Sequence, residues 1–150
     1  MVFSAEQVRD RLARVREEVG PALDIMVDAN QSMTYAEAKR RAKAFEPLDL
    51  SWFEEPLPAD DLTGHVRLAE STSIPIAVGE SMYSLAQFRE YLVREAASVV
   101  QVDVARIGGI TPWLKVAHLA EAFGVDVCAF PDGAAREPRR GDSDVVGRVI

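Results

Sequence analysis

The chain has 150 residues, of which 48% are hydrophobic and 27% charged, a composition typical of a soluble domain with a real core. Its 24 acidic and 17 basic residues give a net charge of -7, and the basic residues form no stripe, so we expect no nucleic-acid partner. No apolar stretch approaches the roughly 20 residues of a membrane span, and the first residues lack the blocks of a signal peptide, so we expect a cytoplasmic protein without a membrane partner.

The first part of the chain predicts a helix, a strand and a second helix. Apolar residues recur at spacings of three and four over the first 20 residues, where Ser4 and Gln7 can form a capping box. Residues 23–28 are a short apolar run that ends on Asp28, which predicts a strand. Thr34 then predicts the cap of the next helix.

The strand and helix pattern then recurs along the chain. Ser84 with Gln87 predicts one helix cap, Thr111-Pro112 predicts the N-cap and first position of another helix, and Gly124 predicts its C-cap. Further strands are predicted over residues 48–54, 74–80, 97–103 and 125–130, of which the first three end on Glu54, Glu80 and Asp103.

These elements predict an α/β fold with a parallel sheet, because the strands lack hydrophobic-polar alternation and both of their faces should be covered. The strand ends recur about every 25 residues, which is typical of a (β/α) barrel, but eight such units need about 250 residues. We therefore expect a parallel (β/α) barrel fragment of about five βα units, an incomplete TIM-type barrel, over residues 1–130. Residues 131–150 predict an irregular tail. A Rossmann-like open sheet is the alternative, although no G-x-G-x-x-G follows a strand.

Four acids end successive predicted strands: Asp28, Glu54, Glu80 and Asp103. In a β/α barrel the active site lies at these strand ends. A single acid there is equally well explained as a helix cap or a solvated loop residue. Four crowded carboxylates repel one another, so they require a cation or raised pKa values, and a purely structural acidic rim is the weaker alternative. Mg2+ prefers hard oxygen ligands, and three carboxylates leave about three positions for water and substrate.

Four motifs resemble the enolase superfamily, in its mandelate racemase and muconate-lactonizing branch, with most similarity to acid-sugar dehydratases. They are DIMVDANQ (24–31), SWFEEP (51–56), PIAVGES (75–81) and VVQVDVARIGGIT (99–111), and the similarity runs from about residue 6 to about residue 128. The resemblance assigns residues 1–130 to part of the C-terminal barrel domain of that superfamily.

The resemblance also implies roles for individual residues. It makes Asp28, Glu54 and Glu80 the Mg2+ ligands and Glu55 a supporting neighbour. It places Asn30 beside the substrate, and it makes Asp103 the residue that orients a catalytic histidine from the next strand.

The chemistry implied by the resemblance is abstraction of the proton next to a carboxylate, since a divalent cation stabilises the resulting enediolate. We expect dehydration of an acid sugar, with racemisation or epimerisation of a 2-hydroxy acid as the alternative. The expected partners are a small-molecule carboxylic acid and further copies of the chain, as a homo-oligomer.

The sequence departs from that family in its bases. Position 130, where the histidine should stand, holds Phe130, and the Lys-x-Lys motif would precede residue 1. The lysines and both histidines, His65 and His118, fall on predicted helices, where we expect solvated or capping roles. We therefore expect little turnover from this chain alone. One alternative interpretation is a remnant that only binds metal or a partner chain. Another is a phosphate-binding barrel with a site at Gly108-Gly109.

Overall fold

The structure, a computed structural model, describes residues 4–130 and 147–149 and confirms the predicted alternation of strands and helices. The helices are α1 (Ala5–Val19), α2 (Tyr35–Phe45), α3 (Leu62–Ala69), α4 (Leu85–Val93) and α5 (Ile110–Ala122), with a short 3-10 helix η1 (Glu46–Leu48). The strands are β1 (Ile25–Asp28), β2 (Trp52–Glu54), β3 (Ile76–Val78), β4 (Val99–Asp103), β5 (Asp126–Phe130) and β6 (Gly147–Val149). None of the described helices is long and apolar enough to cross a membrane.

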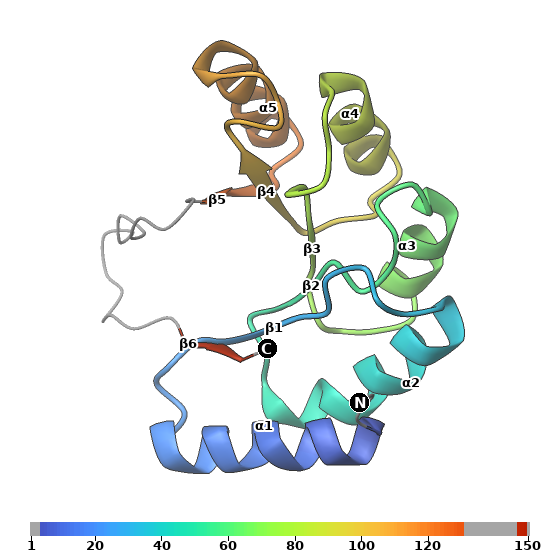
Figure 1. The fold of residues 1–150 in the computed structure, drawn as a ribbon, viewed down its shortest axis with the longest axis vertical. Coiled ribbons are helices and arrows are strands. Elements are labelled where there is room, and N and C mark those ends of the chain that lie inside the picture. The colour runs from blue at the N-terminus through green and yellow to red at the C-terminus, as the bar shows by residue number, and fades with distance from the viewer. Residues whose placement is uncertain (1–3, 131–146, 150) are drawn as a thin grey trace.

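All described strands belong to one parallel sheet with the order β5-β4-β3-β2-β1-β6. The sheet curves, and α1 to α5 follow it as an outer arc (Figure 1). A curved parallel sheet with each crossover helix on the outer side is part of a (β/α) barrel, so the predicted incomplete TIM-type barrel is confirmed. An open Rossmann-like sheet, in which helices lie on both faces, is thereby excluded.

The two faces of the sheet are covered differently. The outer face carries the main core, in which β-strand residues such as Val27, Phe53 and Val100 pack against the helices. The inner face carries a small second cluster of Met26, Trp52, Ala77 and Val99, with Cys128 packed against it. Both faces are therefore apolar, which explains why the strands show no alternation, but helices cover only one of them.

Helix caps agree with the sequence in most places. Ser4 and Gln7 form the full capping box of α1, and the side chains of Thr34 and Ser84 accept backbone N-H groups at the starts of α2 and α4. The C-cap of α5 is Phe123, one residue before the predicted Gly124. Gly124 has a φ of 67° and donates its N-H to Glu121 O at 3.0 Å, so the helix ends in a left-handed glycine directly after its cap.

The predicted N-cap at Thr111 is wrong. The N-cap of α5 is Gly109, and the helix already begins at Ile110. Gly109 has a φ of 116°, and Gly108 before it one of 95°, which lets the chain turn directly from the β4 loop into the helix. A threonine rarely adopts such a conformation, so the glycines displace the start of the helix.

The irregular tail is contradicted at residues 147–149. These residues form β6, which pairs with β1 in parallel register, Met26 opposite Arg148. The free edge of β1 offers unpaired N-H and C=O groups, and the sequence DVVGRVI supplies β-branched residues that suit a strand. Residues 131–146 and 150, where the rest of the predicted tail falls, lie outside the described residues.

Candidate functional site

Asp28 and Glu54 lie side by side at the carboxyl ends of β1 and β2. They are directly opposite in the parallel register, and Ala29 N donates to Glu54 O at 2.9 Å. Both follow by two residues the inner-face pair Met26 and Trp52, so their side chains belong to the inner face. Trp52 Nε1 donates to Glu54 Oε2 at 3.3 Å, which agrees with this placement. Glu54 is only 4% exposed, so its charge lies in a largely desolvated position.

Glu80 follows β3 after a single glycine. A Cβ on Gly79, which has a φ of 139°, would lie 2.7 Å from Gln101 O, so only glycine lets the chain leave the sheet at this point. The side chain of Glu80 is 12% exposed, and its pKa is raised, first by burial and then by the carboxylate of Glu55. Arg106, whose Nη2 lies 3.5 Å from Glu80 Oε1, opposes this shift.

The carboxylates of the site act on one another across three strand ends. Asp28 and Glu54 also contribute to the raised pKa of Glu80, so the three acids that the sequence singled out share one electrostatic environment. As their side chains stand, no three His, Cys, Asp or Glu residues of the described chain form a group that could hold a metal ion. The fold therefore brings the acids to adjacent positions without already converging them on one point.

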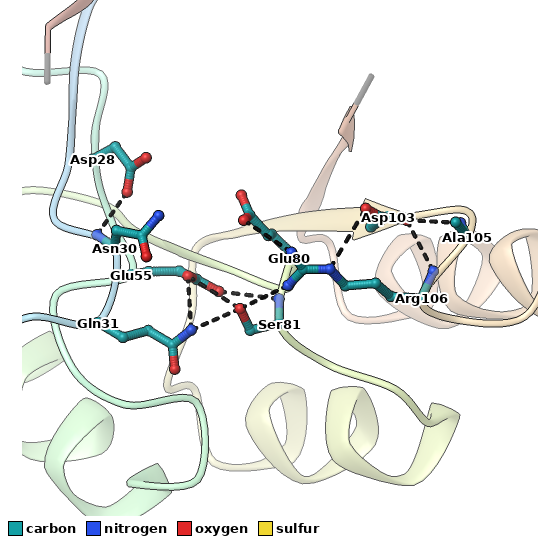
Figure 2. Close-up of polar contacts among 9 residues, drawn as sticks. All are labelled: Asp28, Asn30, Gln31, Glu55, Glu80, Ser81, Asp103, Ala105 and Arg106. Carbon is teal, nitrogen blue, oxygen red and sulfur yellow. Dashed lines mark hydrogen bonds and ion pairs between the residues drawn. The ribbon is translucent and has the colours of Figure 1, made fainter. Parts of the chain in front are cut away.

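Asp103 ends β4 and has a local structural role. Its Oδ1 accepts the backbone N-H groups of Ala105 at 2.7 Å and Arg106 at 2.9 Å, and its Oδ2 lies 3.8 Å from Arg106 Nε (Figure 2). Phe130 stands opposite Asp103 in the register of β4 and β5. The position beside Asp103 on the neighbouring strand therefore holds no histidine that Asp103 could orient.

Asn30 lies two residues beyond Asp28 at the same edge of the sheet. Its backbone N-H donates to Asp28 Oδ1 at 2.8 Å, and its φ of 44° turns the chain sharply away from β1. The residue is exposed and sits directly beside the Asp28 carboxylate, as Figure 2 shows. It is thus close to the acids, in the place where a substrate contact is expected.

A polar cluster at this edge was not predicted from the sequence. Gln31, Ser81 and Arg106 each follow the end of a strand by three residues and join the buried carboxylate of Glu55 in a chain of hydrogen bonds (Figure 2). The available signal was their position, because polar residues just after barrel strands point to the functional edge.

The lysines and histidines all lie on helices, as predicted, but His65 is not solvated. Its side chain is buried, its Nδ1 lies 3.0 Å from both Asp61 O and the Tyr91 hydroxyl, and its ring packs edge-on against Tyr91 at 5.3 Å. Burial lowers the pKa of His65, which favours the neutral ring. The other four are Lys39, Lys43, Lys115 and His118.

The phosphate site considered at Gly108-Gly109 is contradicted. Gly108 N donates to Ala105 O at 3.1 Å, and Gly109 N donates to Val104 O at 2.7 Å. Both N-H groups are therefore already used in the turn that leads into α5, and neither points to an anion.

Comparisons with known proteins agree with this architecture. The chain is 42% identical to an L-talarate/galactarate dehydratase of Salmonella typhimurium over 120 residues, which are 80% of this chain and 30% of that protein. It is 38% identical to an arabinonate dehydratase of Saccharolobus solfataricus over 81% of this chain and 32% of that protein. The chain thus spans about a third of the length of the curated relatives that it matches.

Solved structures show the same likeness. A racemase from Streptomyces coelicolor with bound magnesium superposes with a TM-score of 0.83 at 36% identity, covering 85% of this chain and 36% of that one. An L-talarate dehydratase from Polaromonas sp. complexed with Mg and L-glucarate gives a TM-score of 0.80 at 40% identity, covering 84% of this chain and 35% of that one. Residues 2–133 match the family described as Enolase C-terminal domain-like, and the chain belongs to that family.

Proposed function

We propose that Asp28, Glu54 and Glu80 of this chain bind one Mg2+. The donor set fits this ion, since it consists of carboxylate oxygens at adjacent strand ends. The pKa of Glu80 is raised first by burial and then by neighbouring carboxylates, Asp28 and Glu54 among them. Arg106 Nη2 lies 3.5 Å from Glu80 Oε1, and this positive group beside the carboxylate supports a preference for a cation at this position. The magnesium-bound relatives support the same ion for this edge of the barrel.

The reaction that we infer for the complete site is removal of the proton α to a carboxylate of an acid sugar, followed by loss of a β-hydroxyl. A bound divalent cation stabilises the negative charge that develops on the carboxylate oxygens. In this chain, Asn30 would contact the substrate beside Asp28, and burial of Glu54 would keep water away from the acids. Racemisation or epimerisation of a 2-hydroxy acid is the second candidate, favoured by the likeness to a racemase.

We also infer that the 150-residue chain alone turns over little. All of its lysines and histidines lie on helices of the outer arc, and no strand end that carries an acid also carries a base of this kind. General base catalysis typically contributes about 100 to 10,000-fold, so a site without it retains binding but little rate. A chain that only binds metal is therefore the alternative to an active enzyme.

The setting that we propose is a cytoplasmic homo-oligomer. The described sheet ends on one side at β5, whose outer N-H and C=O groups can pair with another strand.

The metal site is tested by titrating Mg2+ into the purified chain and measuring the heat of binding by isothermal titration calorimetry. Asp28→Asn, Glu54→Gln and Glu80→Gln should each weaken binding at least about 100-fold, because loss of even an outer-shell partner typically costs 10 to 100-fold. Asp24→Asn is the matched control, since Asp24 lies just before β1, at the opposite end of the strand from Asp28, and accepts the Ser51 hydroxyl at 2.8 Å. Unchanged affinity in all three site variants would refute the proposal.

Activity is tested separately with Mg2+ and a panel of acid sugars. We expect turnover well below the roughly 1 to 1,000 per second of ordinary enzymes. A rate within that range would contradict the inference that the chain lacks an effective base, and it would leave the metal site intact.

A further inference from the structure

A buried carboxylate that is not one of the three proposed ligands joins the strand ends of the site. Glu55 is 2% exposed, and its two oxygens accept hydrogen bonds from two other loops (Figure 2). Ser81 N donates to Oε1 at 3.1 Å, while Gln31 Nε2 at 3.2 Å and Ser81 Oγ at 3.4 Å donate to Oε2. Gln31 Nε2 also donates to Ser81 Oγ at 2.7 Å, which closes a ring of three side chains. We call Gln31, Glu55 and Ser81 the strand-end network.

We propose that the strand-end network is a positioning device that sets the spacing of the three ligand carboxylates, an inference that rests on the proposed Mg2+ site. Each member lies within three residues of one ligand in the sequence. Gln31 is three residues after Asp28, Glu55 directly follows Glu54, and Ser81 directly follows Glu80. A side-chain link between any two members therefore fixes the distance between two of the loops that carry the ligands.

The backbone of Glu55 indicates that the direction of its side chain matters. Glu55 has a φ of 38°, in the left-handed region that is unfavourable for a residue with a Cβ. Its N-H donates to Ala77 O at 2.9 Å and its carbonyl accepts Gln31 N at 2.7 Å, so the backbone joins the same three strand ends as the side chain. The unfavourable conformation turns the carboxylate towards the loops of Gln31 and Ser81, whereas Glu54 stays beside Trp52 on the inner face.

The network extends in two directions from this ring. Gln31 Oε1 accepts Ala59 N at 2.8 Å, which fixes the loop that leaves β2. Ser81 Oγ accepts Arg106 Nη1 at 3.1 Å, and Arg106 in turn lies beside Glu80 and Asp103. Four strand ends are thus connected through side chains whose polar groups are mutually satisfied, which makes the arrangement rigid.

A merely structural network would affect stability alone, whereas a positioning device must affect metal affinity beyond its effect on stability. Residues that orient metal ligands from behind typically change affinity 10 to 100-fold when they are mutated. We therefore expect Gln31→Ala and Ser81→Ala to weaken Mg2+ binding about 10 to 100-fold in chains that remain folded. Ser81→Thr keeps the hydroxyl and should restore the affinity.

The matched control is Arg16→Met. Arg16 links segments at the opposite ends of the same strands through four hydrogen bonds to backbone carbonyls, so its loss should lower the melting temperature at least as much. Its Mg2+ affinity should stay within about twofold of that of the unaltered chain, because a ligand set that keeps its geometry keeps its affinity.

The outcomes separate the two proposals. If the unaltered chain does not bind Mg2+, the proposed function fails and the positioning role falls with it. If the unaltered chain binds but folded Gln31→Ala and Ser81→Ala bind equally well, only the positioning role is overturned. Should Ser81→Ala fail to fold, Gln31→Ala decides, since it leaves both contacts between Ser81 and Glu55 in place. An equal loss of affinity in Arg16→Met would also count against the positioning role.

Discussion

The two ends of the same strands are built for different purposes. At the amino ends, the guanidinium of Arg16 donates to four carbonyls in two connecting segments, those of Gly20 and Leu23 before β1 and those of Leu48 and Asp49 before β2. At the carboxyl ends, carboxylates crowd together, and Arg106 lies beside two of them, Glu80 and Asp103. The carboxylates at this end are those of Asp28, Glu54, Glu55, Glu80 and Asp103. At one end a half-buried cation donates its hydrogen bonds to backbone carbonyls, and the other end keeps an excess of negative charge. In barrels, this division separates stability from function.

Backbone conformation marks both ends but for different reasons. Asn30, Gln31 and Glu55 have positive φ values in two adjacent loops at the carboxyl end. The other described non-glycine residues of this kind, Asp49 and Glu95, lie in connecting loops at the amino end. The three at the carboxyl end all contact the acids or belong to the strand-end network, so their strain accompanies function.

The largest effect is expected from breaking the amino end. Arg16→Met should lower the free energy of unfolding by about 2–4 kcal/mol, because several hydrogen bonds to a charged donor are lost. Denaturant unfolding measures this loss. Arg14→Met, at an exposed position of the same helix, is the control and should change stability by less than about 0.5 kcal/mol. Equal losses of stability in both variants would contradict the stabilising role of the Arg16 hydrogen bonds at the amino end.

A second effect concerns pH and the helix layer. The pKa of His65 is lowered by burial from its ordinary value near 6.5, so below that value the unfolded chain binds a proton that the folded chain does not. Stability should therefore be complete above pH 6.5 and decline as the pH falls, with a slope of at most about 1.4 kcal/mol per pH unit, until the pKa of the folded state is passed.

The contribution of His65 is isolated by substitution. His65→Gln should flatten the pH dependence of the melting temperature, whereas His118→Gln, on the exposed face of α5, should leave it unchanged. A slope that survives in His65→Gln would show that His65 is not its cause.

The smallest expected effect concerns repulsion among the acids at the carboxyl ends of the strands. Without metal, Glu80→Gln should raise stability at pH 7 by about 0.5–1 kcal/mol, because it removes one of several repelling charges. With saturating Mg2+ the order should reverse, since only the unaltered chain gains the binding free energy. Thermal unfolding with chelator and with Mg2+ measures both states. A Glu80→Gln chain that is less stable in chelator would show that repulsion among the acids does not destabilise the folded chain.

Much of this architecture could be predicted from local sequence. The apolar runs that stop on Asp28, Glu54 and Asp103 are strands because nothing else buries short continuous apolar segments between helices, and parallel strands bring those acids to one edge. The strand-end network could not be predicted, because it depends on the φ of Glu55 and on contacts across 24 to 50 positions of sequence. His65 was misjudged for the same reason, since Tyr91, the side chain that buries it, lies 26 positions away.

The hydrogen bond between Trp52 and Glu54 has a practical consequence. The chain contains two tryptophans, and Trp52 lies on the inner face with its indole N-H on the carboxylate, while Trp113 donates to Val102 O at 3.0 Å. Indole fluorescence responds to charge and to hydrogen bonding near the ring, so Trp52 would report on the proposed binding of Mg2+. In Trp113→Phe, the remaining tryptophan emission would come from Trp52, whose indole N-H donates to Glu54 Oε2.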